Sequence, residues 1–215
     1  MTGREEACIR LAKLVDVSGK KVLDIGCSIG WFPKIATERL GVKRLDAIEP
    51  DEEKVAQAVK NAWKAKIKQG VAEKLEFKAN SFDVVTMFDV IEHVPSGKEK
   101  KVFDEIARVL KKGGKLALST PYDYWFSRLT DPAWYFGHRH YSVGELSKMI
   151  ERAGMKVTYS RVHGGIWEII AMWVLYISKW IFRAKMPLEE WFDKRRSREF
   201  KRDGYVILFL TAVKE

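Results

Sequence analysis

The sequence predicts an α/β fold in which a mostly parallel sheet is covered by helices on both faces. Over most of the 215 residues, short apolar runs alternate with segments whose apolar residues recur at helical spacing. This alternation is typical of doubly wound parallel sheets. A glycine-rich turn also follows the first expected strand and leads into a helix. In sheets of this kind, ligands bind beyond the carboxyl ends of the strands.

The first half of the chain supplies three of the seven expected strands. Apolar residues at helical spacing predict an N-terminal helix within residues 1–18, most clearly over 4–15. Short apolar runs predict strands over 20–25, 43–48 and 67–69. Helices are expected between them over 31–40 and 51–66, the second with an acidic start that suits the helix dipole.

The second half supplies the other four strands and one long interruption. These strands are predicted over 82–88, 115–120, 155–162 and 205–213. A helix over 98–112 should close at Gly113, and Ser142 is the expected N-cap of a helix over 142–153. Residues 165–203, between the last two strands, are expected to form a mostly helical, aromatic-rich insertion.

The bulk composition sets only broad limits on function. With 47% hydrophobic and 32% charged residues, residues 1–215 are expected to form a single globular domain. The net charge of +10 favours anionic partners such as nucleic acid, anionic lipid or phosphorylated substrates, but the lysines are scattered. Cys8 and Cys27 offer no disulfide framework, and charges within residues 1–18 argue against a signal peptide. We expect a cytoplasmic protein, with peripheral membrane association as an option.

The stretch "VLDIGCSIGWFP", residues 22–33, contains the G-x-S-x-G pattern of a serine nucleophile elbow. An elbow needs strands that precede it to supply an oxyanion hole, and only one expected strand precedes Ser28. A ligand-binding loop fits better, because Gly26 permits a sharp turn and Gly30 permits close backbone approach to a ligand. The loop also opens onto a helix N-terminus, where free N–H groups bind anions.

A carboxylate at the end of the second strand narrows the class of ligand. Glu49 follows Gly26 by 23 positions and can accept hydrogen bonds from both hydroxyls of a ribose. A nicotinamide dinucleotide is disfavoured, because its G-x-G-x-x-G pattern would need glycine where Ser28 and Trp31 stand. The pattern favours a cofactor that has a ribose but no pyrophosphate.

Residues 20–120 resemble a class I S-adenosylmethionine-dependent methyltransferase, of the broad subgroup that includes ubiquinone-biosynthesis O-methyltransferases. The matching pieces occur in the family's order: "VLDIGCSIG", "LDAIEP", "IKQGVAEKLEF", "NSFDVVTMFDVIEHV" and "ARVLKKGGKLALSTP". The resemblance implies a Rossmann-like sheet of seven strands with the last one antiparallel. It also implies S-adenosylmethionine as cofactor and S-adenosylhomocysteine as product.

The resemblance implies a cofactor site made by the glycine loop and by the ends of the following strands. Its residues would be Asp24, Gly26, Cys27, Ser28, Gly30, Glu49, Pro50, Val71, Ala72, Phe88 and Asp89. The loop residues would surround the methionine part, Glu49 would hold the ribose, and Pro50, Val71 and Ala72 would lie at the adenine. The last two residues would border the cofactor.

Two residues depart from the family pattern. Ser28 replaces the usual middle glycine of the loop. Val71 stands where the family commonly has an aspartate that bonds the adenine amino group. The loss of that hydrogen bond would weaken adenine binding by about 1 kcal/mol.

Methyl transfer needs a nucleophile in line with the methyl group and, for some acceptors, a base that removes a proton. The candidate bases are Asp89, Glu92, His93, His138 and His140. We take His93, Asp89 and His140 as the candidate catalytic residues. The plainer interpretation is that Glu92 and His93 bond the backbone of their loop. A chain without a base at the methyl group would be a non-catalytic S-adenosylmethionine-binding protein.

A metal-dependent alternative uses the same side chains. Asp89, Glu92 and His93 could meet His138 and His140 around a divalent metal, which resembles the enzymes that methylate the 2′-hydroxyl at small-RNA 3′ ends. The basic charge would suit RNA. That family has glutamate where Asp89 stands, and Glu-His-Val after the fourth strand also occurs in metal-free methyltransferases. We therefore assign no metal ligand and do not favour RNA as partner.

The acceptor side is expected downstream of the fifth strand. Residues 121–191 carry six of the eight tryptophans, which could line an apolar or ring-shaped acceptor or could pack as core. Residues 121–145 are the expected substrate-side segment. The apolar run 169–177 is too short to span a membrane. The insertion 165–203 could therefore be a lid over a small-molecule or lipid-like acceptor, a homodimer contact, or a face for an anionic membrane surface.

Overall fold

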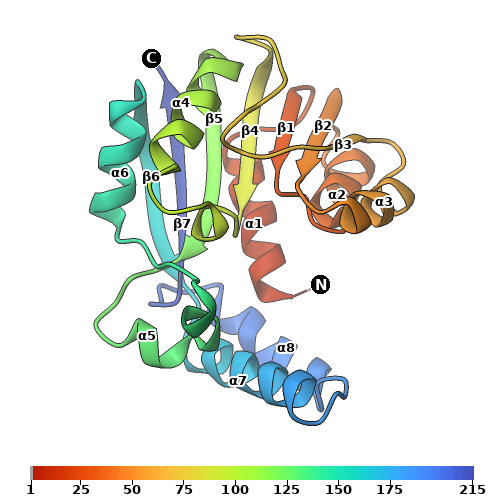
Figure 1. Ribbon diagram of the computed structural model, residues 1–215, viewed down its shortest axis with the longest axis vertical. Coiled ribbons are helices and arrows are strands. Elements are labelled where there is room, and N and C mark those ends of the chain that lie inside the picture. The colour runs from red at the N-terminus through yellow and green to blue at the C-terminus, as the bar shows by residue number, and fades with distance from the viewer. Residues whose placement is uncertain (1) are drawn as a thin grey trace.

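The computed structural model describes residues 2–215, with the side chains at positions 128 and 136 outside the description. A seven-stranded sheet runs through it in the order β3-β2-β1-β4-β5-β7-β6 (Figure 1). The strands are β1 (Lys21–Ile25), β2 (Arg44–Glu49), β3 (Lys66–Gln69), β4 (Phe82–Phe88), β5 (Leu110–Pro121), β6 (Met155–His163) and β7 (Ile207–Lys214). Strands β1 to β5 pair in parallel, and β7 is antiparallel to both of its neighbours. The predicted fold class is confirmed.

Helices cover both faces of the sheet (Figure 1). They are α1 (Gly3–Leu14), α2 (Trp31–Arg39), α3 (Glu52–Asn61), α4 (Glu99–Val109), α5 (Ser127–Thr130), α6 (Val143–Arg152), α7 (Ile166–Trp180) and α8 (Glu189–Glu199), with short 3-10 turns η1 (Ile91–His93) and η2 (Pro132–Phe136). In the view of Figure 1, α4 and α6 lie in front of the sheet and α1 lies behind it.

Two buried apolar clusters, one on each face, hold these layers together. Phe103 of α4 packs in one cluster and Phe32 of α2 in the other. Successive residues of β1 belong to different clusters, since Val22 joins the second and Leu23 the first. Adjacent side chains of a strand point to opposite faces, so a strand covered on both sides reads as a continuous apolar run. This explains why the central strands could be recognised in the sequence.

Helix α6 begins as the sequence predicts. The hydroxyl of Ser142 accepts a hydrogen bond from the Glu145 backbone N–H, and the Glu145 carboxylate accepts one from the Ser142 N–H. This reciprocal capping box satisfies two N–H groups that a helix start otherwise leaves unpaired. The expected N-cap at Ser142 is confirmed.

Two predicted helix ends were wrong. Helix α3 ends at Asn61 rather than near residue 66, because Lys66 already pairs with Asp46 as the first residue of β3. Helix α4 ends at Val109, and the chain continues at once as β5 instead of closing at Gly113. Leu110 pairs with Phe82, and a register shift follows between Phe82 and Val84. Pairing with β4 therefore overrides the local stop signal.

The insertion before the last strand forms α7 and α8, which pack together beyond the carboxyl-end side of the sheet (Figure 1). The carboxylate of Glu199 on α8 accepts hydrogen bonds from three backbone N–H groups at the start of α7, those of Gly165, Trp167 and Glu168. Helix α8 also packs on α1. A Cβ at Gly3 would come within 2.7 Å of the Ser197 Cα, so the absence of a side chain there permits this close crossing.

Candidate cofactor and acceptor site

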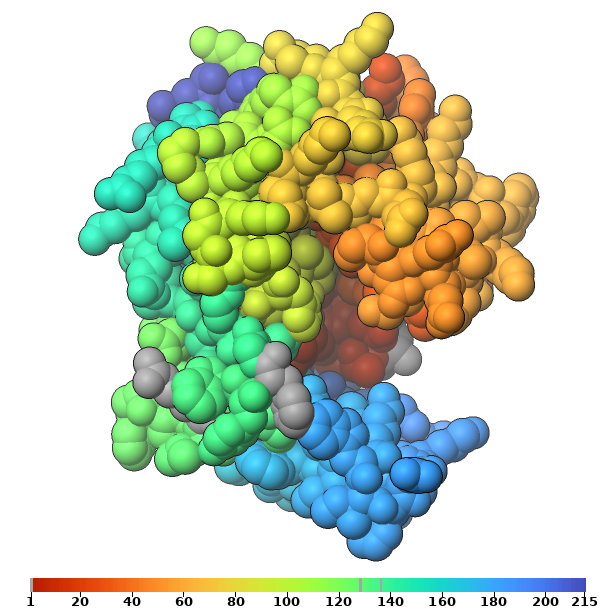
Figure 2. Space-filling view, viewed as in Figure 1, coloured from red at the N-terminus to blue at the C-terminus, as the bar shows by residue number. Residues whose placement is uncertain are grey.

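The carboxyl ends of β1, β2 and β4 meet where the strand order reverses. Strand β1 has β2 on one side and β4 on the other, so the loops that follow these strands leave in opposite directions. Open α/β sheets bind ligands at such a switch point. Figure 2 shows the molecule hollowed on this face, with the red of α1 at the bottom of the hollow and the blue of α7 along its lower rim.

The glycine loop between β1 and α2 adopts a backbone that few residues tolerate. Gly26, Ser28 and Gly30 all have positive φ angles, of 73°, 48° and 86°. A Cβ at Gly26 would lie 2.3 Å from the Val90 side chain, so only glycine fits there. The N–H groups of Gly26 and Cys27 both donate to the Ile48 carbonyl, which ties the loop to the end of β2.

Glu49 fastens this loop from the next strand. It is the last residue of β2 and is buried. Its Oε2 accepts a hydrogen bond of 2.9 Å from the Ser28 N–H, and its Oε1 lies 3.4 Å from the Asp51 N–H. The carboxylate expected to hold a ribose is therefore positioned at the mouth of the glycine loop.

Asp24 provides a second buried carboxyl beside the loop. Its Oδ1 accepts a hydrogen bond of 2.6 Å from the Thr86 hydroxyl of the neighbouring strand β4. Burial raises the pKa of Asp24 to about 7, although the Thr86 hydrogen bond acts in the opposite direction. A cationic ligand group beside Asp24 would favour its ionised form. Asp24 is 2% exposed and lies behind the loop.

Two adjoining cavities of about 300 and 280 Å³ lie at the ends of β1 and β2. They share the lining residues Ile48, Pro50, Gly70 and Val71. Gly26, Ala72 and His93 also line the second cavity. Together the cavities are of the size that small-molecule ligands occupy. Four residues of the expected cofactor site, Gly26, Pro50, Val71 and Ala72, thus face one ligand-sized space.

Other expected cofactor residues lie behind the loop rather than on the cavities. Cys27 and Phe88 are buried in the apolar cluster with Phe32, whose ring centroid lies 5.0 Å from that of Phe88. Burial raises the pKa of the Cys27 thiol well above its usual value. A Cβ at Gly30 would lie 3.1 Å from the Ala58 backbone of α3. These residues shape and support the loop.

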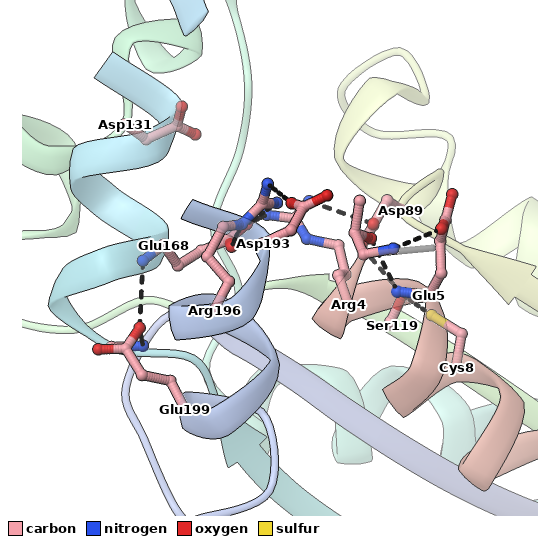
Figure 3. A network of polar contacts seen from close by, with 12 residues as sticks. Arg4, Glu5, Cys8, Asp89, Ser119, Asp131, Glu168, Asp193, Arg196 and Glu199 are labelled. Carbon is pink, nitrogen blue, oxygen red and sulfur yellow. Dashed lines mark hydrogen bonds and ion pairs between the residues drawn. The ribbon is translucent and has the colours of Figure 1, made fainter. Parts of the chain in front are cut away.

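Asp89, the residue after β4, is held by two other elements, β5 and α1. It has a positive φ of 54°. Its Oδ1 accepts a hydrogen bond from the Ser119 hydroxyl at 2.9 Å, and its Oδ2 accepts one from Arg4 of α1 at 3.2 Å. Figure 3 shows Arg4 between Asp89 and Glu168 of α7, to which it donates at 2.7 Å. Asp89 is therefore fixed between β5 and α1 at the border of the cofactor site.

The network continues from Glu168 to α8. The Arg196 guanidinium donates to both oxygens of Glu168, at 2.5 and 3.2 Å, and also contacts Asp193 (Figure 3). Glu168 is buried, and burial alone would raise its pKa, but the charges of Arg4 and Arg196 hold that pKa below its usual value. An ionised carboxylate therefore joins α1, α7 and α8 beneath the hollow.

Two histidines contact Asp131, and a third, His93, links this group to the second cavity. The Nε2 atoms of His93 and His138 lie 3.1 Å apart. The Nδ1 of His138 and the Nε2 of His140 each lie 3.0 Å from Asp131 Oδ2. Burial opposes ionisation of Asp131, but the hydrogen bonds from these two histidines hold its pKa below the usual value. Because Asp131 is ionised, His138 donates its Nδ1 proton to it.

Glu92 lies under this group and is 1% exposed. Its Oε2 accepts a hydrogen bond of 2.9 Å from the Thr120 hydroxyl, whereas its Oε1 has no partner among the described atoms. Burial, reinforced by the charge of Asp89, raises its pKa well above the usual value. Ligand atoms of Glu92, His93 and His138 lie within 4.8 Å of one another, a spacing at which they could hold a metal ion.

The predicted catalytic residues thus occupy different surroundings. His93 lines the second cavity, Asp89 is an ion-pair partner, and His140 is bound to Asp131. The Glu92 carboxylate accepts a hydrogen bond from Thr120 and also interacts with its own backbone, and the His93 ring contacts His138. Sequence reasoning did not single out Arg4, Asp131 or Glu168, and their spacing along the chain carries no signal that connects them.

A comparison with families of known proteins identifies the central part of the chain. Residues 23–118, which contain the glycine loop, Glu49 and Asp89, match the family model described as "Methyltransferase domain". This range ends within β5 and so leaves out α5 to α8.

Curated relatives match over a similar region. A protein of Mycolicibacterium smegmatis described as "Probable S-adenosylmethionine-dependent methyltransferase" is 32% identical over 158 residues, which cover 72% of this chain and 60% of the relative. A ubiquinone biosynthesis O-methyltransferase of Xanthomonas oryzae is 34% identical over 111 residues, 49% of this chain and 45% of the relative. The chain therefore spans less than two thirds of the length of these relatives.

Solved structures share the fold at low sequence identity. An S-adenosylmethionine-dependent methyltransferase from Mesorhizobium loti superimposes with a TM-score of 0.70 at 16% identity, covering 97% of this chain and 98% of that one. The [4+2]-cyclase SpnF superimposes with a TM-score of 0.68 at 17% identity, covering 98% and 81%. These likenesses show the sheet and its helices, and a fold shared with a cyclase does not by itself decide the chemistry.

Proposed function

We propose that this chain, which belongs to the class I S-adenosylmethionine-dependent methyltransferases, transfers a methyl group to an oxygen, nitrogen or carbon atom of an apolar or amphipathic acceptor. The observation that carries the proposal is the contact between Glu49 and the Ser28 N–H. It sets a buried carboxylate at the mouth of the glycine loop, next to two ligand-sized cavities. A ribose with neighbouring hydroxyl groups fits such a carboxylate.

The residues at the switch point fit each part of the cofactor. Glu49 would bind the ribose hydroxyls, and Asp24 would bind the amino group of the methionine part. Pro50, Val71 and Ala72 line the cavities on the side where the adenine would lie. When bound, S-adenosylmethionine supplies a methyl group activated by a sulfonium charge, so the protein has mainly to orient the acceptor and accept its proton.

His93 is the group best placed to accept a proton from the acceptor. Desolvation and the neighbouring His138 lower its pKa, so its ring is neutral near pH 7 and has a free lone pair. Because His138 donates its Nδ1 proton to Asp131, its Nε2 accepts a hydrogen bond from the His93 Nε2–H, and the two nitrogen atoms lie 3.1 Å apart. The free lone pair of His93 is then on Nδ1, and a proton taken up there would give an imidazolium that is hydrogen-bonded to His138. Asp131 and His138 would then act as positioning residues that stabilise the protonated ring.

The apolar or amphipathic character of the acceptor is supported by α7 and by the segment before α6. Met172 of α7 lines a small cavity together with Asp131, His138 and His140. Tyr176, one turn further along α7, has its pKa raised by burial and by the charge of Asp131. Apolar and aromatic groups thus lie on the acceptor side of the histidines. A fully polar acceptor would gain little from such a wall.

Calorimetric titration of the purified protein with S-adenosylhomocysteine tests the cofactor half of the proposal. We expect binding, and we expect Glu49→Ala to weaken it by roughly 10- to 150-fold, the equivalent of about 1.5–3 kcal/mol for hydrogen bonds to a charged group. Glu52→Ala, an exposed acid three positions further on, is the matched control and should bind normally. An unchanged affinity in Glu49→Ala, or no binding by the wild type, would contradict the proposal.

A second candidate function is metal-dependent methylation of an RNA 2′-hydroxyl. The close approach of Glu92, His93 and His138 favours it, because a cation would satisfy the unpaired Glu92 oxygen and both imidazole nitrogens. We rank it second because Asp89 is already bound to Arg4 and Ser119. Turnover that survives chelators supports the first candidate. Loss of turnover on chelation, with recovery in Mn²⁺ or Mg²⁺, supports the second.

A further inference from the structure

One face of α7 is both apolar and exposed. Ile166, Ile170, Trp173, Ile177 and Trp180 follow one another at intervals of four, three, four and three residues, and all are classed as exposed. In a helix this spacing places them in one line along the surface. Trp173 is 38% exposed and Ile177 is 40% exposed. We call these five residues the outer stripe of α7.

The other sides of α7 are already in contact with the protein. Ile169 and Ala171 are buried, Glu168 is bound by Arg4 and Arg196, and Met172 lines the small cavity next to the histidines. An ordinary surface helix turns its polar side to water. In α7 the buried side carries the Glu168 carboxylate, and the exposed side carries the apolar residues of the outer stripe. A contiguous exposed patch of this kind marks an interaction surface.

The chain beyond the outer stripe is apolar and cationic. From Tyr176 to Leu188 it contains Lys179, Arg183 and Lys185 and no acidic residue. Ile181 and Phe182 are each 70% exposed, and all three cations are exposed. Tryptophan rings and long basic side chains with apolar stems are the residues that settle at a lipid headgroup layer. Cations next to an apolar face attract anionic headgroups in particular.

Length decides how α7 could meet a bilayer. Its 15 residues extend about 22 Å, less than the roughly 30 Å of a hydrocarbon core. Within residues 2–215, no helix has the length and hydrophobicity needed to cross a membrane. A helix of this kind lies in the plane of the interface, with its apolar face toward the acyl chains.

We propose that the outer stripe of α7, with the cationic stretch 179–185, docks this protein on an anionic lipid surface. We assign a bilayer as the partner because exposed tryptophan and isoleucine side chains lie next to exposed cations, the combination that suits an anionic headgroup layer, and a second copy of the chain is an outcome that the test distinguishes. Since α7 also forms the lower rim of the hollow (Figure 2), docking would hold the acceptor side at the membrane. The inference adds a partner to the proposed function but does not depend on catalysis.

Sedimentation with vesicles tests the docking. We expect the wild type to co-sediment with phosphatidylcholine vesicles that contain phosphatidylglycerol. Its binding to pure phosphatidylcholine vesicles should be weaker by about tenfold or more, since each nearby cation contributes to anionic binding. High salt should release most of the bound protein. Trp173→Glu combined with Ile177→Glu should lower binding by about tenfold or more, because both side chains would have to enter the apolar layer.

Matched controls separate docking from general effects. Val59→Glu combined with Trp63→Glu places the same charges on exposed apolar residues near the end of α3. Two further double variants change the net charge equally at exposed positions. Arg183→Glu with Lys185→Glu lies inside the proposed surface, and Lys60→Glu with Lys64→Glu lies outside it. Only the variants within 173–185 should lose vesicle binding, and all should keep the wild-type affinity for S-adenosylhomocysteine. Failure to bind either vesicle, equal loss in the controls, or a concentration-dependent mass abolished by Ile177→Glu would overturn the proposal.

Discussion

The Arg4 guanidinium donates a hydrogen bond of 3.2 Å to the Asp89 carboxylate, across 85 positions of sequence. The same side chain donates to Glu168 of α7 at 2.7 Å. Burial alone would lower the pKa of Arg4, but the charges of Asp89 and Glu168 raise it above the usual value. The partly buried Arg4 side chain of the first helix therefore holds both the border of the cofactor site and α7, the helix along its rim.

Replacement of Arg4 by leucine should be strongly destabilising. The substitution removes one of the two guanidinium partners of the buried Glu168 carboxylate, which keeps only Arg196, and we expect a cost of about 3 kcal/mol. For a chain of this size we expect the melting temperature to fall by about 6–12 °C, measured by circular dichroism. Lys13→Leu, at an exposed position of the same helix, should change it by no more than about 2 °C. Equal effects of the two substitutions would show that Arg4 does not serve as this link.

Asp24→Asn should change the pH dependence of stability. In the folded protein the pKa of Asp24 is about 7, whereas an exposed aspartate has a pKa of about 3.9. Between these values the folded state holds a proton that the unfolded state has lost, so the carboxyl lowers stability as the pH rises through this window. The melting temperature of Asp24→Asn should exceed that of the wild type by about 4–8 °C more at pH 8 than at pH 5.

The control for Asp24 is Asp104→Asn, which changes an exposed carboxyl of α4. Its difference from the wild type should vary little with pH. A constant difference between Asp24→Asn and the wild type across the same range would mean that Asp24 is already ionised in the folded protein.

Ser28 should tolerate glycine and reject threonine. Its φ of 48° is a conformation that costs most residues about 1 kcal/mol or more, and glycine adopts it freely. We expect Ser28→Gly to bind S-adenosylhomocysteine within about tenfold of the wild type and to melt at the same or a slightly higher temperature. The β-branched Ser28→Thr should melt lower. Covalent labelling of Ser28 by a fluorophosphonate would instead mark it as a nucleophile.

Activity should fall on the acid side of its pH profile, at a pH below the ordinary pKa of histidine. His93 has a lowered pKa, so its neutral form persists below about pH 6.5 and is lost only as the pH falls further. Asp131→Asn removes the charge that orients His138. It should lower kcat by about tenfold or more and leave the KM for S-adenosylmethionine unchanged.

The pH-rate profile of Asp131→Asn supplies a second readout. The charge of Asp131 raises the pKa of His93, so its removal should move the acid limb to still lower pH. His163→Gln, which changes a histidine bonded to the Arg202 carbonyl, is the control and should leave the profile unaltered. If Asp131→Asn kept the wild-type pH profile, Asp131 would not act on His93 in the acceptor site.

The parts of the fold that sequence could predict are those set by neighbouring residues. Strand β4 follows a mostly apolar run, and α6 follows from Ser142 and Glu145 three positions apart. The loop around Gly26 and the carboxylate of Glu49 are likewise local features. The end of α4 could not be predicted, because it depends on the pairing of Leu110 with Phe82 in another strand.

The acceptor side was harder to predict because its contacts join distant segments. His138 meets His93 across 45 positions, and Arg4 meets Glu168 across 164. Among the predicted catalytic residues, Asp89 was expected to border the cofactor and to be a candidate base. Its engagement with Arg4 depends on where α1 crosses the sheet, which no local pattern records.

The position of β7 has a consequence for how the protein is made. The last of the seven strands to leave the ribosome lies inside the sheet, between β5 and β6, and pairs with both along most of its length. Until it emerges, the nascent sheet stops at β5 and presents an open edge, while β6, the apolar helix α7 and the charged helix α8 lack the strand that holds them to the sheet. Open strand edges and apolar helices are what folding chaperones bind and what neighbouring nascent chains aggregate through. We expect ribosome-bound chains that end before residue 207 to be protease-sensitive beyond β5 and to become resistant over residues 155–203 only once β7 is released.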